Sequence, residues 1–189
     1  MYYHASPVGG IRILEPKVSN HGVPLIYFSK KRENVLVYLS NAVEKFCRDT
    51  GYVHTGKWTK WASYGFRDGI QLLEEYYPNA LTETYQGISG YIYRVASIQE
   101  AEQDIHIPDA AVSSLPVPVD GVEFIPDAYE AILEAEQRGE IFITRYEAMT
   151  ESRRAWHERT IQEEYDSAGE QPEYRYFLKI KFDFIRCTV

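Results

Sequence analysis

Hydrophobic and polar positions alternate towards both ends of the chain, which predicts strands there. Short apolar runs at residues 1–4 and 22–29 predict two buried strands, and residues 90–97 (GYIYRVAS) have the alternation of a central strand. The most regular alternation lies at residues 174–185 (YRYFLKIKFDFI), where aromatic and aliphatic residues alternate with charged ones, and it predicts a C-terminal strand. Residues 108–126 carry several prolines, which favours edge strands joined by loops.

Apolar residues at helical spacing mark other segments. Residues 34–48 place apolar side chains three and four positions apart, and Gly51 stands where a helix terminator is expected. A short helix is predicted near residues 69–77, ended by Pro78. Two more helices are predicted at residues 127–140 and 150–165. The second of these is rich in charge, and its Trp156 and His157 are predicted to lie on a solvated face.

The strands and helices do not follow one another in regular βαβ order, so the pattern predicts an α+β fold rather than a doubly wound sheet. The 189 residues fit one domain, 1–189. A chain of this length buries roughly 70% of its unfolded surface. The segment around residues 50–85, rich in aromatic residues and glycine, is predicted to be a helical and aromatic insertion. Its Trp58 and Trp61 are candidates for a pocket wall, although core packing is the commoner role of tryptophan.

The charge balance disfavours nucleic acid as a partner. The formal net charge is −8 and the pI is about 5.2, whereas nucleic-acid binding depends on clustered lysine and arginine. The short basic run Lys30–Lys31–Arg32 can meet a phosphate, but a solvated turn is the favoured interpretation.

The cysteines and histidines predict neither a disulfide framework nor a metal site, and a cytoplasmic location is expected. Cys47 and Cys187 are far apart and predicted to be buried or inert thiols, and the scattered histidines predict no metal site. A signal peptide and a membrane-spanning segment are not expected, because no basic region precedes a long apolar stretch.

One ordered set of residues near the beginning of the chain carries chemistry. The first predicted strand ends in His4 to Ser6 (HAS), the second contains Leu25 to Ser29 (LIYFS), and Tyr38 follows on the first predicted helix. This order resembles the ADP-ribosyltransferase superfamily, which includes diphtheria-toxin-like and poly(ADP-ribose) polymerase-like enzymes, rifampin ADP-ribosyltransferases and RNA 2′-phosphotransferases. In that superfamily a His-Gly-Ser/Thr tripeptide, an aromatic strand and a second tyrosine follow in this sequence.

The resemblance implies an ADP-ribosyltransferase-like split β-sheet with flanking helices and a pocket for NAD, which is consumed as substrate. A neutral His4 would bond a ribose hydroxyl together with Ser6, and the backbone of Ala5 would contact the carboxamide. Tyr27 and Tyr38 would sandwich the pyridine ring, each stacking contact contributing about 0.5–1.5 kcal/mol. The candidate NAD-binding residues are therefore His4, Ala5, Ser6, Tyr27, Ser29 and Tyr38.

The superfamily pattern also contains a carboxylate, usually glutamate, on a later strand. There it stabilises the oxocarbenium-like transition state formed as nicotinamide leaves. The local counterpart begins at Ala110 (AAVS), so alanine occupies the glutamate position. Asp109, one residue earlier, and Glu123, followed by an aromatic residue, are the two candidate catalytic residues. In a regular strand, a slip of one residue would turn Asp109 to the opposite face.

NAD-dependent ADP-ribosyl transfer, with release of nicotinamide to leave ADP-ribose on an unidentified acceptor, is therefore the preferred function. A non-catalytic NAD-binding or ADP-ribose-binding protein of the same fold is one alternative. An NAD-dependent RNA 2′-phosphotransferase-like enzyme is another, although the acidic composition disfavours an RNA substrate. In the plainest interpretation His4, Tyr27 and Tyr38 are core residues and the fold has no ligand.

Overall fold

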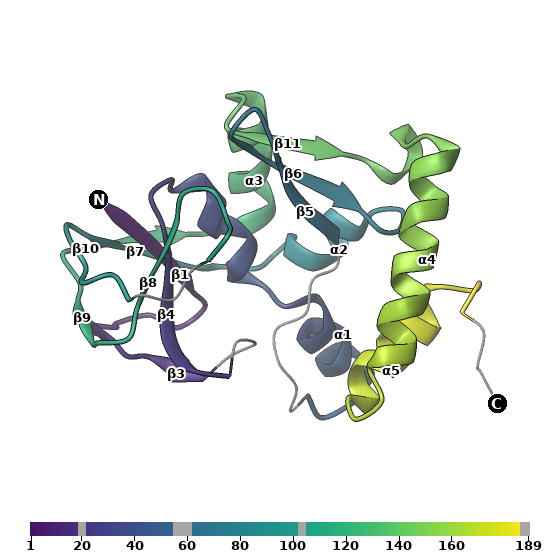
Figure 1. Cartoon of the computed structure of the whole chain (residues 1–189), viewed down its shortest axis with the longest axis horizontal. Helices are drawn as coiled ribbons and strands as arrows, with labels where there is room; N and C mark the ends of the chain where they lie inside the picture. Colours follow the sequence, from purple (N-terminus) through teal and green to yellow (C-terminus); the bar gives the residue numbers. More distant parts are fainter. Residues whose placement is uncertain (19–21, 55–61, 102–104, 186–189) are drawn as a thin grey trace. The chain divides into compact units, whose positions relative to one another are not determined.

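The computed structural model describes residues 1–18, 22–54, 62–101 and 105–185 (Figure 1). These residues form two compact units, each assembled from three segments of the chain. Unit 1 consists of residues 1–40, 66–71 and 85–142, and unit 2 of residues 41–65, 72–84 and 143–189. Helices and strands occur in both, so the predicted α+β class is confirmed.

Unit 1 is built on an antiparallel sheet with the strand order β10-β7-β1-β4-β3, in which β8 also pairs with β4. β1 is an interior strand, with His4 opposite Tyr93 and Ala5 opposite Ile92 on β7. The predicted strands near the beginning of the chain and at residues 90–97 are confirmed, and residues 108–126 form short strands joined by loops. The strands are β1 (Tyr2–Ser6), β3 (Lys17–Val18), β4 (Pro24–Ser29), β7 (Gly90–Val95), β8 (Ala110–Ser113) and β10 (Gly121–Ile125).

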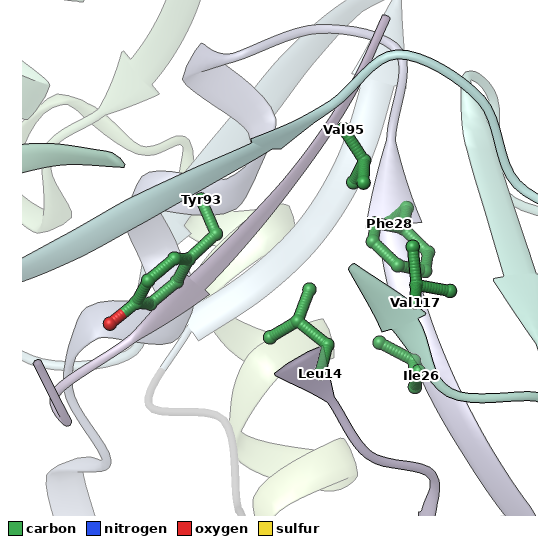
Figure 2. Close-up of a cluster of buried hydrophobic side chains, with 6 residues drawn as sticks. All are labelled: Leu14, Ile26, Phe28, Tyr93, Val95 and Val117. Atoms are coloured by element: carbon green, nitrogen blue, oxygen red, sulfur yellow. The ribbon is translucent and has the colours of Figure 1, made fainter. Parts of the chain in front are cut away.

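One face of this sheet carries a buried hydrophobic cluster. The small pair formed by β2 (Ile13–Leu14) and β9 (Val117–Pro118) covers it. Figure 2 shows side chains from β2 and β9 gathered with those from β4 and β7. Full burial of a side chain of this size stabilises the fold by about 1.5–3 kcal/mol. The buried cluster consists of Leu14, Ile26, Phe28, Tyr93, Val95 and Val117.

The opposite face is covered by the 3₁₀ helix η1 (Glu33–Leu39), against which α3 (Ala128–Gln137) packs. This contact is close at Gly90, where an added Cβ would lie 2.6 Å from Leu39 Cδ2. Because side chains alternate along a strand, the residues on the face of Gly90 include Ile92 and its partner Ala5. The predicted helix at residues 127–140 corresponds to α3.

The helix predicted at residues 34–48 is divided. η1 ends at Leu39, Ser40 is extended, and the α-helix α1 begins at Ala42 and continues to Thr50. Asn41 causes the restart, because its side chain accepts hydrogen bonds from two backbone N–H groups of the first turn of α1. Gly51 ends α1 as predicted, with a φ of 74°.

A second sheet has the order β11-β6-β5. Its strands are β5 (Ala62–Arg67), β6 (Ile70–Glu75) and β11 (Ile141–Thr144), and the chain passes from one unit to the other within each of them. The helix predicted near residues 69–77 is therefore wrong. Asp68 and Gly69 have φ values of 53° and 74°, the geometry of a two-residue turn between adjacent strands, so the chain continues as β6.

Unit 2 is mainly helical. It contains α1, most of α2 (Ala80–Tyr85), the 3₁₀ helix η2 (Tyr146–Ala148), α4 (Glu151–Ser167) and α5 (Pro172–Lys181). α5 packs against both α1 and α4, and Ile161, Phe177 and Leu178 are almost fully buried. The prediction of a helix at residues 150–165 is confirmed. No helix among the described residues has the length and apolar character needed to cross a membrane.

The predicted C-terminal strand is wrong, because Pro172–Lys181 is the helix α5. The apolar residues of this segment satisfy two periods at once. Tyr174, Phe177 and Leu178 are buried at helical spacing, whereas Ile180, required by the alternating pattern, is 54% exposed. Pro172 occupies the first turn, where its fixed φ and missing N–H suit a helix.

Candidate functional site

The candidate site lies in unit 1, where β1 and β4 separate. The two strands share a single registered pair, Tyr3 opposite Ser29. The other edge of β4 pairs with β8 from Ile26 to Ser29. Beyond the Tyr3–Ser29 pair, His4 Nδ1 is 2.8 Å from the Tyr27 carbonyl oxygen. We call this place, bounded by residues 4–6 and 26–28, the β1–β4 split.

The partner of His4 determines which ring nitrogen carries the proton. A carbonyl oxygen only accepts, so Nδ1–H donates to Tyr27 and Nε2 of the neutral ring is an acceptor. Burial lowers the pKa of His4, the hydrogen bond to Tyr27 opposes this, and the charge of Lys17 lowers the pKa further. The imidazole is therefore neutral near pH 7 and offers an acceptor, which is what binding a ribose hydroxyl requires.

The two tyrosines of the predicted set approach each other. Desolvation raises the pKa of Tyr38, and the neighbouring Tyr27 phenol raises it further. Tyr38, on η1, is 45% exposed. The His4 ring contacts Phe28, with centroids 5.9 Å apart, and side chains of successive strand residues alternate. The Tyr27 phenol thus lies on the face of β4 opposite to the one that carries Phe28 and the His4 ring. The structure therefore brings the two phenols together and places the His4 ring on the other face of the sheet.

The two serines of the predicted set bond locally. Ser6 Oγ accepts from Val8 N at 3.1 Å, and the buried Ser29 Oγ accepts from Lys31 N at 3.1 Å. Both are turn interactions of the kind that serine commonly makes. Ala5 pairs with Ile92 on β7, and no strand of the described residues pairs with it on the β4 side.

The basic run Lys30–Arg32 leads from β4 into η1, and each of its residues meets a different carboxylate. Lys30 Nζ lies 4.0 Å from Glu100, and Lys31 Nζ lies 3.1 Å from Asp109. Arg32 donates two hydrogen bonds to Glu123, from Nε at 2.9 Å and from Nη2 at 2.6 Å. These pairs hold the run at the surface of unit 1, and they involve both candidate catalytic residues.

The two candidate carboxylates are held differently. Arg32 forms a bidentate ion pair with Glu123, and this pair lowers the pKa of the Glu123 carboxyl. Glu123 lies on β10, the outermost strand on its side of the sheet. Asp109 immediately precedes β8, which is hydrogen-bonded to β4. Its φ of 61° is outside the strand region, so the alternation that would have turned its side chain away does not apply.

Sequence reasoning missed Asn34. This η1 residue is only 6% exposed, and neither its side-chain oxygen nor its nitrogen has a hydrogen-bond partner among the described residues. Buried amides of this kind are normally satisfied by protein, water or ligand. The signal in the sequence was a polar residue opening an otherwise apolar run, NVLVYL.

Other predicted residues lie elsewhere. Trp58, Trp61, His21 and Cys187 fall outside the described residues, and Cys47 is a buried free thiol. His157 is 1% exposed, so its predicted place on a solvated face is wrong, because the side chain packs against Tyr76 beneath α4. Comparison of the chain with protein-family models, curated proteins and solved structures gives no match.

Proposed function

We propose that unit 1 binds NAD at the β1–β4 split and transfers its ADP-ribosyl group to an acceptor. The observation that carries the proposal is the His4–Tyr27 hydrogen bond, because it leaves a neutral imidazole with an acceptor nitrogen at the point where the sheet opens. The resemblance of residues 4–38 to the ADP-ribosyltransferase pattern supports the same conclusion.

In this proposal Nε2 of His4 accepts a hydrogen bond from a ribose hydroxyl. The side of the Ala5 backbone that faces β4 contacts the carboxamide, and Ser6 and Ser29 border the site. Tyr27 and the exposed ring of Tyr38 hold the nicotinamide from the η1 side. A planar ligand fixed in this way loses the freedom that would otherwise oppose bond cleavage.

Asp109 is the proposed charge stabiliser. Cleavage of the bond between nicotinamide and ribose builds positive charge on the ribose, and nicotinamide leaves as a neutral molecule. Asp109 is preferred because it lies at the end of β4 and because its carboxylate is paired with the partly exposed Lys31, which a phosphate of NAD can take over. Glu123 is fully engaged by Arg32, so its proposed role is to hold the beginning of η1 against β10.

Two measurements on one sample test this function: the melting temperature and free nicotinamide after incubation with NAD. A ligand that binds only the folded state raises the melting temperature. Wild-type protein should show both signals, whereas His4→Gln should lose both and the control His54→Gln, in unit 2, neither. If NAD changes neither the melting temperature nor the nicotinamide content, the proposal is wrong.

A second candidate is a protein that binds NAD without consuming it. The observation that favours it is the pairing of both candidate carboxylates with basic side chains. Asp109→Asn and Glu123→Gln separate the two. If Asp109 stabilises the transition state, Asp109→Asn should keep the thermal shift with NAD. Its rate of nicotinamide release should fall about 100-fold or more, as expected when one transition-state contact is removed. A thermal shift in wild type without any release would favour the binding protein.

A further inference from the structure

Unit 2 contains a cavity of about 290 Å³ between α4, the chain that follows β6 and the residues that follow α5. Its wall is largely aromatic, with Tyr76, Tyr77, Phe182 and Phe184 among the lining residues. The ring centroid of Phe182 lies 5.6 Å from that of Tyr77 and 5.6 Å from that of Phe184, so these three side chains form a continuous apolar surface. Such a surface suits an apolar or aromatic group of a few atoms.

Charged side chains of both signs line the same cavity. Arg154 and Glu158 come from α4, and Asp183 follows α5. None of these three takes part in an ion pair with another residue that the structure describes. Lys181 also lines the cavity, but it is already paired with Glu83. The cavity therefore offers one cation and two carboxylates that form no ion pair with another described residue.

Two hydrogen-bond donors in the wall have no partner among the described residues. They are the hydroxyl of Tyr76, a residue that is 4% exposed, and Nε of Arg154. The remaining contacts of Arg154 are a hydrogen bond from Nη2 to the Glu147 carbonyl at 3.0 Å and a stack over the Tyr146 ring. Both atoms are themselves buried from solvent, so the cavity's polar contacts are left to the rest of the Arg154 guanidinium and to the two carboxylates.

We propose that this cavity binds a small zwitterion with an apolar side chain, that is, a free α-amino acid. Its carboxylate meets the guanidinium of Arg154. Its ammonium meets Glu158 and Asp183, and its side chain packs on the aromatic wall. A simple anion would be repelled by the two carboxylates and a simple cation by Arg154, so only a ligand with both charges matches the site.

The first test uses unmodified protein and three probes: L-phenylalanine, 3-phenylpropionate and phenethylamine. The last two lack the ammonium and the carboxylate, respectively, and keep the ring. Titration calorimetry should show that L-phenylalanine binds at least about tenfold more tightly than either analogue, the usual effect of losing one charged hydrogen bond. Equal binding of all three probes, or no binding of L-phenylalanine, overturns the proposal.

The second test identifies the residues. Arg154→Gln should weaken L-phenylalanine about tenfold while leaving phenethylamine unchanged or improved, and Asp183→Asn should weaken L-phenylalanine and phenethylamine but not 3-phenylpropionate. Arg159→Gln, an exposed neighbour on α4 outside the cavity, is the matched control. If Arg154→Gln binds L-phenylalanine as wild type does, the assigned site is wrong. These results do not depend on NAD, because the cavity and the β1–β4 split belong to different units.

Discussion

His4 illustrates how one side chain links local structure to protonation. In the folded chain burial lowers its pKa, so the unfolded chain takes up a proton first as the pH falls from neutrality. Stability contributed by the neutral ring is therefore complete above the unfolded pKa of about 6.5 and is lost as the pH falls from there towards the folded pKa.

This sign gives a prediction for His4→Gln. Urea unfolding at a series of pH values should show the free energy of unfolding of wild type falling, relative to the variant, below about pH 6.5. The slope should not exceed about 1.4 kcal/mol per pH unit, the limit for one proton. Above pH 7 the difference should be constant. A difference that stays constant down to pH 5 would mean that the imidazole titrates normally.

Gly90 supports a second prediction at the same scale. An alanine Cβ would lie 2.6 Å from Leu39 Cδ2 and 3.2 Å from the Ser6 carbonyl oxygen, so the buried Leu39 side chain would have to shift within the packed layer between η1 and the sheet. Gly90→Ala should lower the free energy of unfolding by about 1–3 kcal/mol, the usual cost of overpacking. Gly65→Ala on β5 is the matched control, since nothing lies within 4 Å of its added Cβ. Equal effects in chemical denaturation would contradict this packing.

Individual residues show where sequence reasoning succeeded and where it failed. The terminator Gly51 was predictable because few residues other than glycine adopt a φ of 74° without strain. Asp68–Gly69 is the standard signal for a hairpin turn, yet the helix predicted near residues 69–77 did not take it into account. The burial of His157 was not predictable, because it depends on a tertiary contact with Tyr76 that no local pattern contains.

At the scale of elements, the spacing of apolar residues decided whether a strand or a helix could be predicted correctly. The strands β1, β4 and β7 were predictable because their apolar residues fit only one interpretation. The segment that forms α5 fits both an alternating and a helical period, and packing against α1 and α4 selects the helix. Of the candidate site, the order of residues was predictable, whereas the β1–β4 split and the pairing of Lys31 and Arg32 with two carboxylates depend on register.

The start of α3 yields a prediction for an element. Asp127 Oδ1 accepts from the backbone N–H groups of Tyr129 at 2.8 Å and Glu130 at 3.3 Å, and Oδ2 accepts from Gly87 N at 2.9 Å. Asp127→Ala should therefore cost about 1–2 kcal/mol in thermal or urea unfolding. Glu134→Ala, at an exposed position on α3, should cost less than about 0.5 kcal/mol. The prediction is wrong if the two variants are equally stable.

At the scale of the whole molecule, the two units are interleaved along the chain. Each consists of three segments, so the chain passes between them five times. Neither unit is a continuous stretch that is made and folded before the other begins. We expect the chain to unfold in a single cooperative transition, as small proteins usually do.

Core variants in each unit test this expectation. Ile132 in unit 1 and Ile161 in unit 2 are both fully buried. Replacing either with valine should cost about 0.5–1.5 kcal/mol and shift the same transition in differential scanning calorimetry. Two transitions, each moved by only one of the variants, would show that the units unfold separately.

The outermost position of β10 has a consequence for the behaviour of the protein in concentrated solution. Val122 and Phe124 are more than half exposed, at 53% and 55%, on a strand with a single described neighbour. An open row of peptide groups beside apolar side chains is a template for adding strands from another molecule. Glu123, between them, forms an ion pair with Arg32, so this stretch of the edge carries little net charge to oppose such stacking. Self-association along β10 would set a practical upper limit to the concentration at which the protein is stored.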